Sequence, residues 1–437
     1  MPAPAPSAAV PAPSAVVPAP SAGTADRPRG VTSVCSAHPL VLEAAMLQAA
    51  ADDATLLIEA TCNQVNHRGG YTGLTPAAFR ERVDHIAERA GFPPEQVVLG
   101  GDHLGPSPWR RAPAEMAMEE ARAMVAAYVA AGYQKIHLDC SMGCQGEPER
   151  LGHAVAAERA ARLVVVSEGE AAACPAPPAY VVGTEVPTPG GARHKIEALE
   201  VTEPGAVLAT VDAHRRAFAS VGAAAAFDRV VAVVAQPGVE FDNEAVVVYQ
   251  PGRARELKDA LDQLPGLVLE AHSTDYQPAA SLAELVRDGF SILKVGPGLT
   301  FAMREALYAL DNIAGALDPR WSEHSLVSVM EGEMLARPEH WAAYYQGSPS
   351  SQRALRHYSY SDRIRYYWSS PVAEQAVQAL FDRLDETGLP LPLVSQFMPA
   401  LYQRAAAGVV ALTAKSLVLE AVRDVLRIYS AACRGTA

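Results

Sequence analysis

The 437-residue sequence predicts an α/β protein built on a closed (β/α)8, or TIM, barrel with a helical C-terminal extension. Short apolar, β-branched runs alternate with longer Ala-, Glu- and Arg-rich stretches, and eight such runs are present. Polar residues gather at the carboxyl end of nearly every run, where barrels of this class build their sites. An open doubly wound sheet is the alternative, but it rarely needs eight parallel strands, and the sequence has no Gly-x-Gly-x-x-Gly turn.

The expected strands are near-continuously apolar, which is typical of parallel strands covered on both faces. They are Val31–His38, Leu56–Thr61, Val97–His103, Lys135–Ser141, Tyr180–Val186, Val230–Gly238, Leu267–Ser273 and Phe290–Pro297. The helices expected between them are Pro39–Ala51, Thr75–Ala90, Ala112–Ala131, Glu149–Glu168, Glu203–Val221, Arg253–Gln263 and Ser281–Asp288. A further helix is expected from about Thr300, so that the barrel spans residues 31–316.

Two segments outside the barrel differ in composition. Residues 1–30 are rich in Pro, Ala and Ser, with Pro-Ala-Pro-Ser-Ala recurring at Pro4, Pro11 and Pro18. Such a tract has too few large apolar side chains to pack, so a disordered tail is expected. Residues 317–437 carry helical stretches and an aromatic cluster at Tyr358–Trp368. We expect a helical extension packed on the barrel, with structural packing favoured over substrate contact.

Composition narrows the class of protein. The net charge of -13 argues against a surface that binds nucleic acid, although a sugar phosphate needs only a few local donors. The six cysteines are thinly spread, as in a cytoplasmic protein with reduced thiols. No apolar stretch approaches the roughly 20 residues that span a bilayer. We therefore expect a cytoplasmic protein that binds a small molecule and neither nucleic acid nor a membrane. We also expect it to form a homo-oligomer.

The polar residues at the strand ends form the candidate site. Buried charges are costly unless they are paired or bind a metal, so their collection at one end of eight strands indicates function. The residues singled out for the site, in chain order, are His38, Glu59, Asn63, Asp102, His103, Asp139, Ser141, Glu185, Gln236, Glu270, His272, Ser273, Asp275, Lys294, Gly296 and Gly298. Glu270 and His272 share one face of a strand, as do His137, Asp139 and Ser141.

Several of these side chains suit a divalent metal ion. His103, His272 and Glu185 supply nitrogen and oxygen donors of the kind that bind Zn²⁺ or Mn²⁺ with an open position. Asp102 and Asp139 remain as acid–base candidates. Other members of the set have a structural alternative: Glu59 could simply pair with Lys135 or Lys294 across the barrel.

The glycine-rich end of the eighth run is a candidate phosphate site. Lys294-Val-Gly-Pro-Gly298 precedes a predicted helix, and barrels often bind phosphate after strands 7 and 8 through backbone N–H groups. Ser273 could join such a site. The alternative, in which Gly296 and Gly298 merely turn the strand into the helix, is equally open.

The same strand-end motifs resemble those of the GatZ/KbaZ family of tagatose-bisphosphate aldolase subunits. The resemblance covers roughly residues 30–430. The motifs that carry it are Cys35-Ser-Ala-His-Pro39, Glu59-Ala-Thr-Cys-Asn-Gln-Val-Asn66, Leu99-Gly-Gly-Asp-His-Leu-Gly-Pro106, Lys135-Ile-His-Leu-Asp139, Gly183-Thr-Glu-Val-Pro187, Gln236-Pro-Gly-Val-Glu-Phe241, Glu270-Ala-His-Ser-Thr-Asp-Tyr276 and Ser361-Asp-Arg-Ile-Arg-Tyr-Tyr367.

The resemblance implies a class II aldolase-like barrel. The Asp-His pair of those enzymes resembles Asp102-His103, and a later metal histidine resembles His272. Their other metal histidine falls near Gln236, so that Glu185 or Gln236 is expected to fill the gap. The side chains expected to carry the chemistry are Asp102, Asp139, Glu185 and Glu270.

Two functions are compatible with this family. The first is metal-dependent C4 epimerisation of a ketohexose or its 6-phosphate (tagatose, fructose or sorbose) by retro-aldol and aldol steps. The alternative is a non-catalytic subunit that stabilises and activates a class II tagatose-1,6-bisphosphate aldolase. The acids and histidines at the strand ends favour the enzyme, because a scaffold has no need to bury them.

Overall fold

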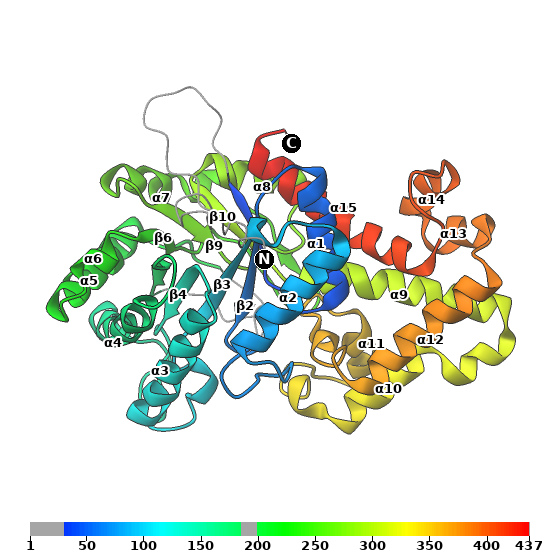
Figure 1. The fold of residues 1–437 in the computed structure, drawn as a ribbon, viewed down its shortest axis with the longest axis horizontal. Helices are drawn as coiled ribbons and strands as arrows, with labels where there is room; N and C mark the ends of the chain where they lie inside the picture. The colour runs from blue at the N-terminus through cyan, green and yellow to red at the C-terminus, as the bar shows by residue number, and fades with distance from the viewer. Residues whose placement is uncertain (1–29, 185–198, 437) are drawn as a thin grey trace, which may run out of the picture.

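The computed structural model describes residues 30–184 and 199–436, and the expectation of a disordered N-terminal tail lies outside these residues. Eight parallel strands close into a barrel in the order β1-β10-β9-β6-β5-β4-β3-β2, which confirms the predicted fold class (Figure 1). The strands are β1 (Val31–Val34), β2 (Leu56–Thr61), β3 (Val97–Leu104), β4 (Lys135–Asp139), β5 (Ala179–Gly183), β6 (Val230–Val234), β9 (Val268–Ala271) and β10 (Phe290–Val295).

Several strands end earlier than their apolar runs predict. Strand β1, for example, stops at Val34, which is in register with Val295 of β10 and Ile58 of β2. One more bond, from the Cys35 N–H to the Val295 carbonyl, closes the ladder. The residues beyond lie in loops at the carboxyl mouth of the barrel, because no neighbouring strand continues to pair with them.

Helices cover the outside of the barrel, and each expected helix is present within a few residues. They are α1 (Pro39–Ala51), α2 (Pro76–Ala90), α3 (Ala114–Ala130), α4 (His153–Ala171), α5 (Pro204–Ser220), α6 (Ala224–Phe227), α7 (Arg255–Ala260) and α8 (Ala279–Arg287). Helix α2 illustrates the local signals: Thr75 caps its first turn and Gly91, with φ 67°, ends it in the left-handed conformation. A short hairpin, β7 (Glu240–Phe241) and β8 (Val246–Val247), follows β6.

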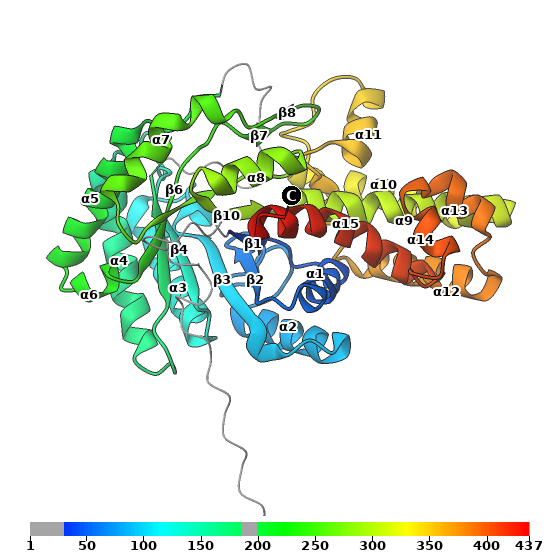
Figure 2. The ribbon, with the colours of Figure 1, turned by 90° about the horizontal axis from the view of Figure 1, so that it is seen from above.

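The C-terminal residues leave the barrel and return to it. Helix α9 (Pro297–Leu317) projects away from β10, and α12 (Pro371–Thr387), α13 (Leu391–Phe397) and α14 (Pro399–Ala406) lie at its far end (Figure 2). Helix α15 (Ala414–Arg434) then runs back and packs against α1, α8 and α9. Its Cys433 carbonyl accepts the Gly30 N–H beside β1. The last helix thus covers the wall between α8 and α1, while the domain boundary at residue 316 stays a prediction.

Two further helices and a short 3-10 helix connect the projecting part of the chain, formed by α9 and α12–α14, to the mouth of the barrel. They are α10 (Leu326–Ala336), α11 (Pro349–Tyr358) and η8 (Arg363–Tyr366). In the part of the chain that the structure describes, no helix is both long enough and apolar enough to cross a membrane.

The inside of the barrel changes from apolar to charged along its strands. Small clusters separate from the main core fill the amino-terminal half of the lumen: Leu57, Val98, Val181, Ala232, Val234, Val268 and Ile292. Two residues further along β2, β9 and β10 stand Glu59, Glu270 and Lys294, on the same strand faces. Gly100 leaves room for Glu59, because a Cβ there would lie 2.7 Å from the Glu59 Cγ.

Candidate active site

A buried network of ion pairs crosses the barrel above this apolar floor. Lys135 Nζ lies 2.6 Å from Glu59 Oε1 and 2.7 Å from Glu270 Oε2. Lys294 Nζ lies 2.8 Å from Glu59 Oε2, 2.7 Å from Asp102 Oδ1 and 3.3 Å from Glu270 Oε1. Glu59 therefore pairs with both lysines, as expected if its role is structural, and Lys294 forms ion pairs with three carboxylates.

Opposite charges keep Asp102 and Glu270 ionised. Burial alone raises the pKa of Asp102, but the charges of His103 and Lys294 and a hydrogen bond from His137 hold it well below its usual range. Burial likewise raises the pKa of Glu270, and Lys135 and Lys294 outweigh it. At neutral pH both side chains are carboxylates.

Three imidazoles stand around this network. The ring centroids of His103 and His272 are 4.8 Å apart, those of His103 and His137 5.2 Å, and those of His137 and His272 5.3 Å. Each imidazole contacts a buried carboxylate through one nitrogen. The pairs are His103 Nδ1 with Asp139 Oδ2 at 2.8 Å, His137 Nδ1 with Asp102 Oδ1 at 2.8 Å, and His272 Nε2 with Glu270 Oε1 at 2.9 Å. Carboxylates behind imidazoles are the usual support of histidines that bind metals.

The nitrogen and oxygen atoms left over have spacings that suit a metal ion. His103 Nε2 lies 3.2 Å from His272 Nδ1 and 3.7 Å from Asp102 Oδ2. Tetrahedral ligands at Zn–N distances of about 2.0–2.1 Å are roughly 3.3 Å apart. Asp102, His137, Glu270 and His272 each offer one donor atom, and these four atoms all lie within 4.8 Å of one another. His137 Nε2 is buried and has no hydrogen-bond partner among the described residues.

Two members of this set are placed by unusual backbone. Consecutive strand residues normally point to opposite faces, yet Asp102 and His103 both line the same cavity. His103 has φ 52°, and the β3–β4 register shifts between Gly101 and Leu104. Ser273, directly after His272, has φ 54°. Non-glycine residues adopt this conformation at a cost that is common at functional sites.

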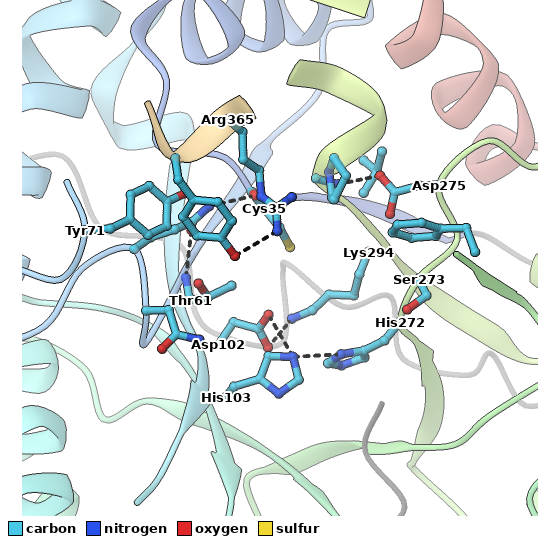
Figure 3. A pocket seen from close by; sticks show the side chains of 17 residues that line it. Cys35, Thr61, Tyr71, Asp102, His103, His272, Ser273, Asp275, Lys294 and Arg365 are labelled. Atoms are coloured by element: carbon cyan, nitrogen blue, oxygen red, sulfur yellow. Dashed lines mark hydrogen bonds and ion pairs between the residues drawn. The ribbon is translucent and has the colours of Figure 1, made fainter. Parts of the chain in front are cut away.

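These side chains line an open cavity at the carboxyl mouth of the barrel. The empty space in this cavity, counted together with the solvent at its entrance, is about 610 Å³. Figure 3 shows Asp102, His103, Lys294 and His272 along one side and Arg365 on the opposite side. Lining residues are Cys35, Thr61, Asn63, Gln64, Tyr71, Asp102, His103, Phe241, His272, Ser273, Asp275, Lys294, Val295, Gly296, Pro297, Arg365 and Tyr366.

Some predicted site residues lie behind the cavity or beside it. Ser141 donates its backbone N–H and its hydroxyl to Asp139 Oδ1, at 3.0 and 2.6 Å. His38 caps α1, because its Nδ1 accepts the Leu40 N–H at 3.2 Å, and it lines a second, adjoining cavity. Glu185 lies outside the described residues.

Gln236 is not brought to the site. Its side-chain oxygen accepts the N–H groups of Gly238 and Val239 at 2.8 and 2.9 Å, which closes its own turn. Gln236 does not line the cavity, so the structure lends its predicted role as a metal ligand no support. The third imidazole beside His103 and His272 is instead His137. The sequence offered one signal for it, because His137 and Asp139 stand two residues apart on one strand face.

The glycine turn that predicted a phosphate site is already occupied by a side chain. Asp275 Oδ1 accepts the N–H groups of Gly296 and Gly298 at 2.9 and 2.7 Å. A carboxylate thus takes the backbone donors that would otherwise meet a phosphate at the start of α9. Burial raises the pKa of Asp275 to about 6, despite these hydrogen bonds.

The fold and the site together define a (β/α)8-barrel protein with a buried acid–imidazole cluster at its carboxyl mouth. The chain belongs to the GatZ/KbaZ-like family, described as D-tagatose-1,6-bisphosphate aldolase subunit GatZ/KbaZ-like, whose model matches residues 20–434. The resemblance predicted from the strand-end motifs is confirmed.

Two relatives are similar over nearly the whole chain. A D-tagatose 6-phosphate 4-epimerase from Agrobacterium fabrum is 53% identical over 409 residues, which cover 93% of this chain and 96% of the relative. A crystal structure described as a probable tagatose 6 phosphate kinase from Sinorhizobium meliloti is 54% identical with a TM-score of 0.86, and the match covers 93% of this chain and 100% of that one.

Proposed function

We propose that this protein catalyses the metal-dependent epimerisation of a ketohexose, or of its 6-phosphate, at C4. The observation that carries the proposal is the convergence of Asp102 Oδ2, His103 Nε2 and His272 Nδ1 at one cavity wall. The name of the Agrobacterium relative supports the same reaction, and its substrate, tagatose 6-phosphate, is a ketohexose 6-phosphate.

The charges of the site suit a divalent cation such as Zn²⁺ or Mn²⁺. Four buried carboxylates meet two ammonium groups, which leaves an excess of two negative charges when the imidazoles are neutral: Glu59, Asp102, Asp139 and Glu270 against Lys135 and Lys294. His103 and His272 would hold the ion, with His137 as a further candidate ligand, and a carboxylate supports each imidazole. A bound ion supplies Lewis-acid polarisation of the sugar's C2 carbonyl.

The chain's own residues can move the proton that the reaction needs. Lys294 and His137 hold Asp102 Oδ1, which leaves Oδ2 as the base for the C4 hydroxyl. As the proton moves to Asp102, the C3–C4 bond breaks, C4 becomes an aldehyde, and the bonding electrons pass to the C2–C3 unit. After the aldehyde turns over, C3 attacks its other face and Asp102 returns the proton, which inverts C4.

The names of the two relatives agree on tagatose 6-phosphate and differ on the reaction. A kinase must also cradle the phosphates of a nucleotide, usually with backbone N–H groups of a glycine-rich turn. In the glycine turn that follows β10, the N–H groups of Gly296 and Gly298 are both held by Asp275. This contact favours the epimerase over phosphoryl transfer.

The direct test is to incubate the purified protein with tagatose 6-phosphate, fructose 6-phosphate and the free sugars, with Zn²⁺ or Mn²⁺ and then with EDTA. We expect C4 epimers to form only with metal, and no ADP to form when ATP is added. An Asp102→Asn variant should bind the sugar and form no epimer. Absence of metal-dependent interconversion in all arms would refute the proposal.

A purely supportive role in a class II aldolase gives no physical reason for three carboxylate-backed imidazoles at an open cavity. It would be recognised if the protein formed no epimer but raised the stability and activity of an aldolase subunit purified with it. Homo-oligomer formation stays a prediction.

A further inference from the structure

The C-terminal extension contributes one arginine to the wall of the active-site cavity. Arg365 belongs to η8, and its side chain points into the cavity from the side opposite Asp102 and His272 (Figure 3). The rings of Tyr71 and Tyr366, whose centroids are 4.6 Å apart, lie beside it, and its Cζ is 4.5 Å from the centroid of the Tyr366 ring. An extension expected mainly to pack on the barrel thus reaches the candidate site.

The guanidinium of Arg365 is anchored at one end and has unused donors at the other. Its Nη1 donates to the carbonyl oxygens of Ser361 and Asp362, the latter at 3.1 Å, and its Nη2 donates to the Tyr366 hydroxyl at 3.0 Å. Among the residues that the structure describes, its Nε–H and the second N–H of Nη2 have no hydrogen-bond partner. The N–H groups of Nε and Nη2 point from the same edge of the guanidinium. Together they can donate two parallel hydrogen bonds to two oxygens of a carboxylate or phosphate.

The position of Arg365 is set by the backbone before it. Asp362 has φ 45° and starts η8 in the left-handed conformation. Its Oδ2 accepts a 2.5 Å hydrogen bond from Thr300 Oγ1, which ties η8 to the first turn of α9 beside the barrel mouth. Arg365 is therefore held in place before any ligand arrives, which reduces the entropic cost of binding.

The other cations and donors of the cavity are already engaged. The ammonium group of Lys294 forms ion pairs with Glu59, Asp102 and Glu270, so its charge is already balanced by carboxylates. The N–H groups of the glycine turn are held by Asp275. Among the described residues that line this cavity, Arg365 is the one that combines a permanent positive charge with unused donors.

We propose that Arg365 binds the phosphate of a ketohexose 6-phosphate, so that the C-terminal extension, and not the glycine turn after β10, confers specificity for phosphorylated sugars. This inference rests on the proposed function for the identity of the sugar. An anion held at Arg365 directs the carbonyl end of the sugar across the cavity toward Asp102 and His272. Specificity and chemistry then come from opposite walls of one cavity.

The test compares phosphorylated and free sugars in variants of one short element. In Arg365→Met, we expect the Kd and KM for tagatose 6-phosphate to rise roughly 10- to 100-fold, the effect of losing a charge-assisted bidentate contact. The kcat/KM for free tagatose, which carries no phosphate, should fall much less than that for tagatose 6-phosphate. Arg365→Lys keeps the positive charge but cannot donate two parallel hydrogen bonds. This variant should therefore recover part of the lost affinity for tagatose 6-phosphate. Inorganic phosphate should compete with tagatose 6-phosphate in the wild type and not in Arg365→Met.

Arg363→Met is the matched control. Arg363 belongs to the same 3-10 helix, but its guanidinium lies 3.3 Å from the centroid of the Tyr344 ring, and it lines neither this cavity nor the adjoining one. We expect this variant to keep the preference for the phosphorylated sugar. Thermal melting of each variant checks that the fold is retained.

The outcomes separate this inference from the proposed function. If folded Arg365→Met keeps the wild-type preference for tagatose 6-phosphate, the phosphate binds elsewhere and the inference is wrong. Equal binding of phosphorylated and free sugars by the wild type would overturn it as well. If binding depends on Arg365 but the wild type forms no epimer, the inference stands and the proposed reaction fails.

Discussion

Lys135→Met tests the buried network at a residue that does not line the cavity. The Nζ of Lys135 contacts Glu59 Oε1 at 2.6 Å and Glu270 Oε2 at 2.7 Å, and all three side chains are almost fully buried. Methionine keeps an unbranched apolar side chain of similar length and removes the ammonium group. One oxygen of each carboxylate then lies in the barrel without its partner.

Removing one partner of a buried pair costs about 3–5 kcal/mol, because a desolvated charge is left behind. Lys294 still contacts both Glu59 and Glu270, so the variant should remain folded. With an entropy of unfolding of about 2.1 cal/mol/K per residue, we expect the melting temperature of this 437-residue chain to fall by roughly 3–5 °C.

The pH dependence of this loss has a definite sign. In the wild type, burial raises the pKa of Glu270, but Lys135 and Lys294 lower it well below its ordinary value. A group with a lowered folded pKa stabilises the protein above its unfolded pKa of about 4.3, and that stability is lost as the pH falls. Without Lys135 the pKa of Glu270 rises, so the deficit of the variant should shrink as the pH approaches about 4.

Thermal melting at about pH 7.5 and about pH 5 measures both effects. Lys258→Met is the control, because its Nζ contacts Asp288 at 3.0 Å at the surface, where such pairs contribute about 0–1 kcal/mol. If Lys135→Met melts at the same temperature as Lys258→Met at both pH values, the buried ion pairs do not stabilise the barrel.

Three other perturbations test the site and its surroundings. His137→Ala should lower the amount of metal bound per chain and Gln236→Ala should not, as measured by elemental analysis; metal loss in the glutamine variant alone would reverse the assignment. Asp139→Asn should weaken metal affinity by roughly 10- to 100-fold in a chelator competition, because His103 loses its supporting carboxylate. Burial raises the pKa of Asp362 to about 7, so its carboxyl group costs stability as the pH rises from about 4 through 7. Asp362→Asn should therefore raise the free energy of unfolding by about 1–3 kcal/mol at pH 8 and by less at pH 5; equal melting temperatures at both would contradict this.

Much of the fold could be predicted because its signals are local. A parallel strand covered on both sides needs a continuous apolar run, and a covering helix needs a longer stretch of helix-forming residues. Both patterns are readable within about 20 residues, which is why β2 and α1 match their predicted bounds. The carboxyl ends of the strands were harder to predict, since a strand ends where its neighbour stops pairing.

The candidate site could be predicted only in part. Asp102, His103 and His272 stand at strand ends, and the structure brings all three to one cavity. Strict alternation would have sent Asp102 and His103 to opposite faces, and the left-handed backbone at His103 prevents this. Gln236 was included because it ends a strand, but local hydrogen bonds to its own turn hold its side chain away.

The sequence by itself determined the barrel, the family and the mouth as the place where the polar residues meet. Only the tertiary structure decided which donors remain free. Asp275 binds the backbone N–H groups of the glycine turn, and three carboxylates surround Lys294. Arg365, from the C-terminal helical extension, lines the same cavity. The physical reason is that a polar group's chemistry depends on its partner, and barrel closure joins partners that lie many residues apart.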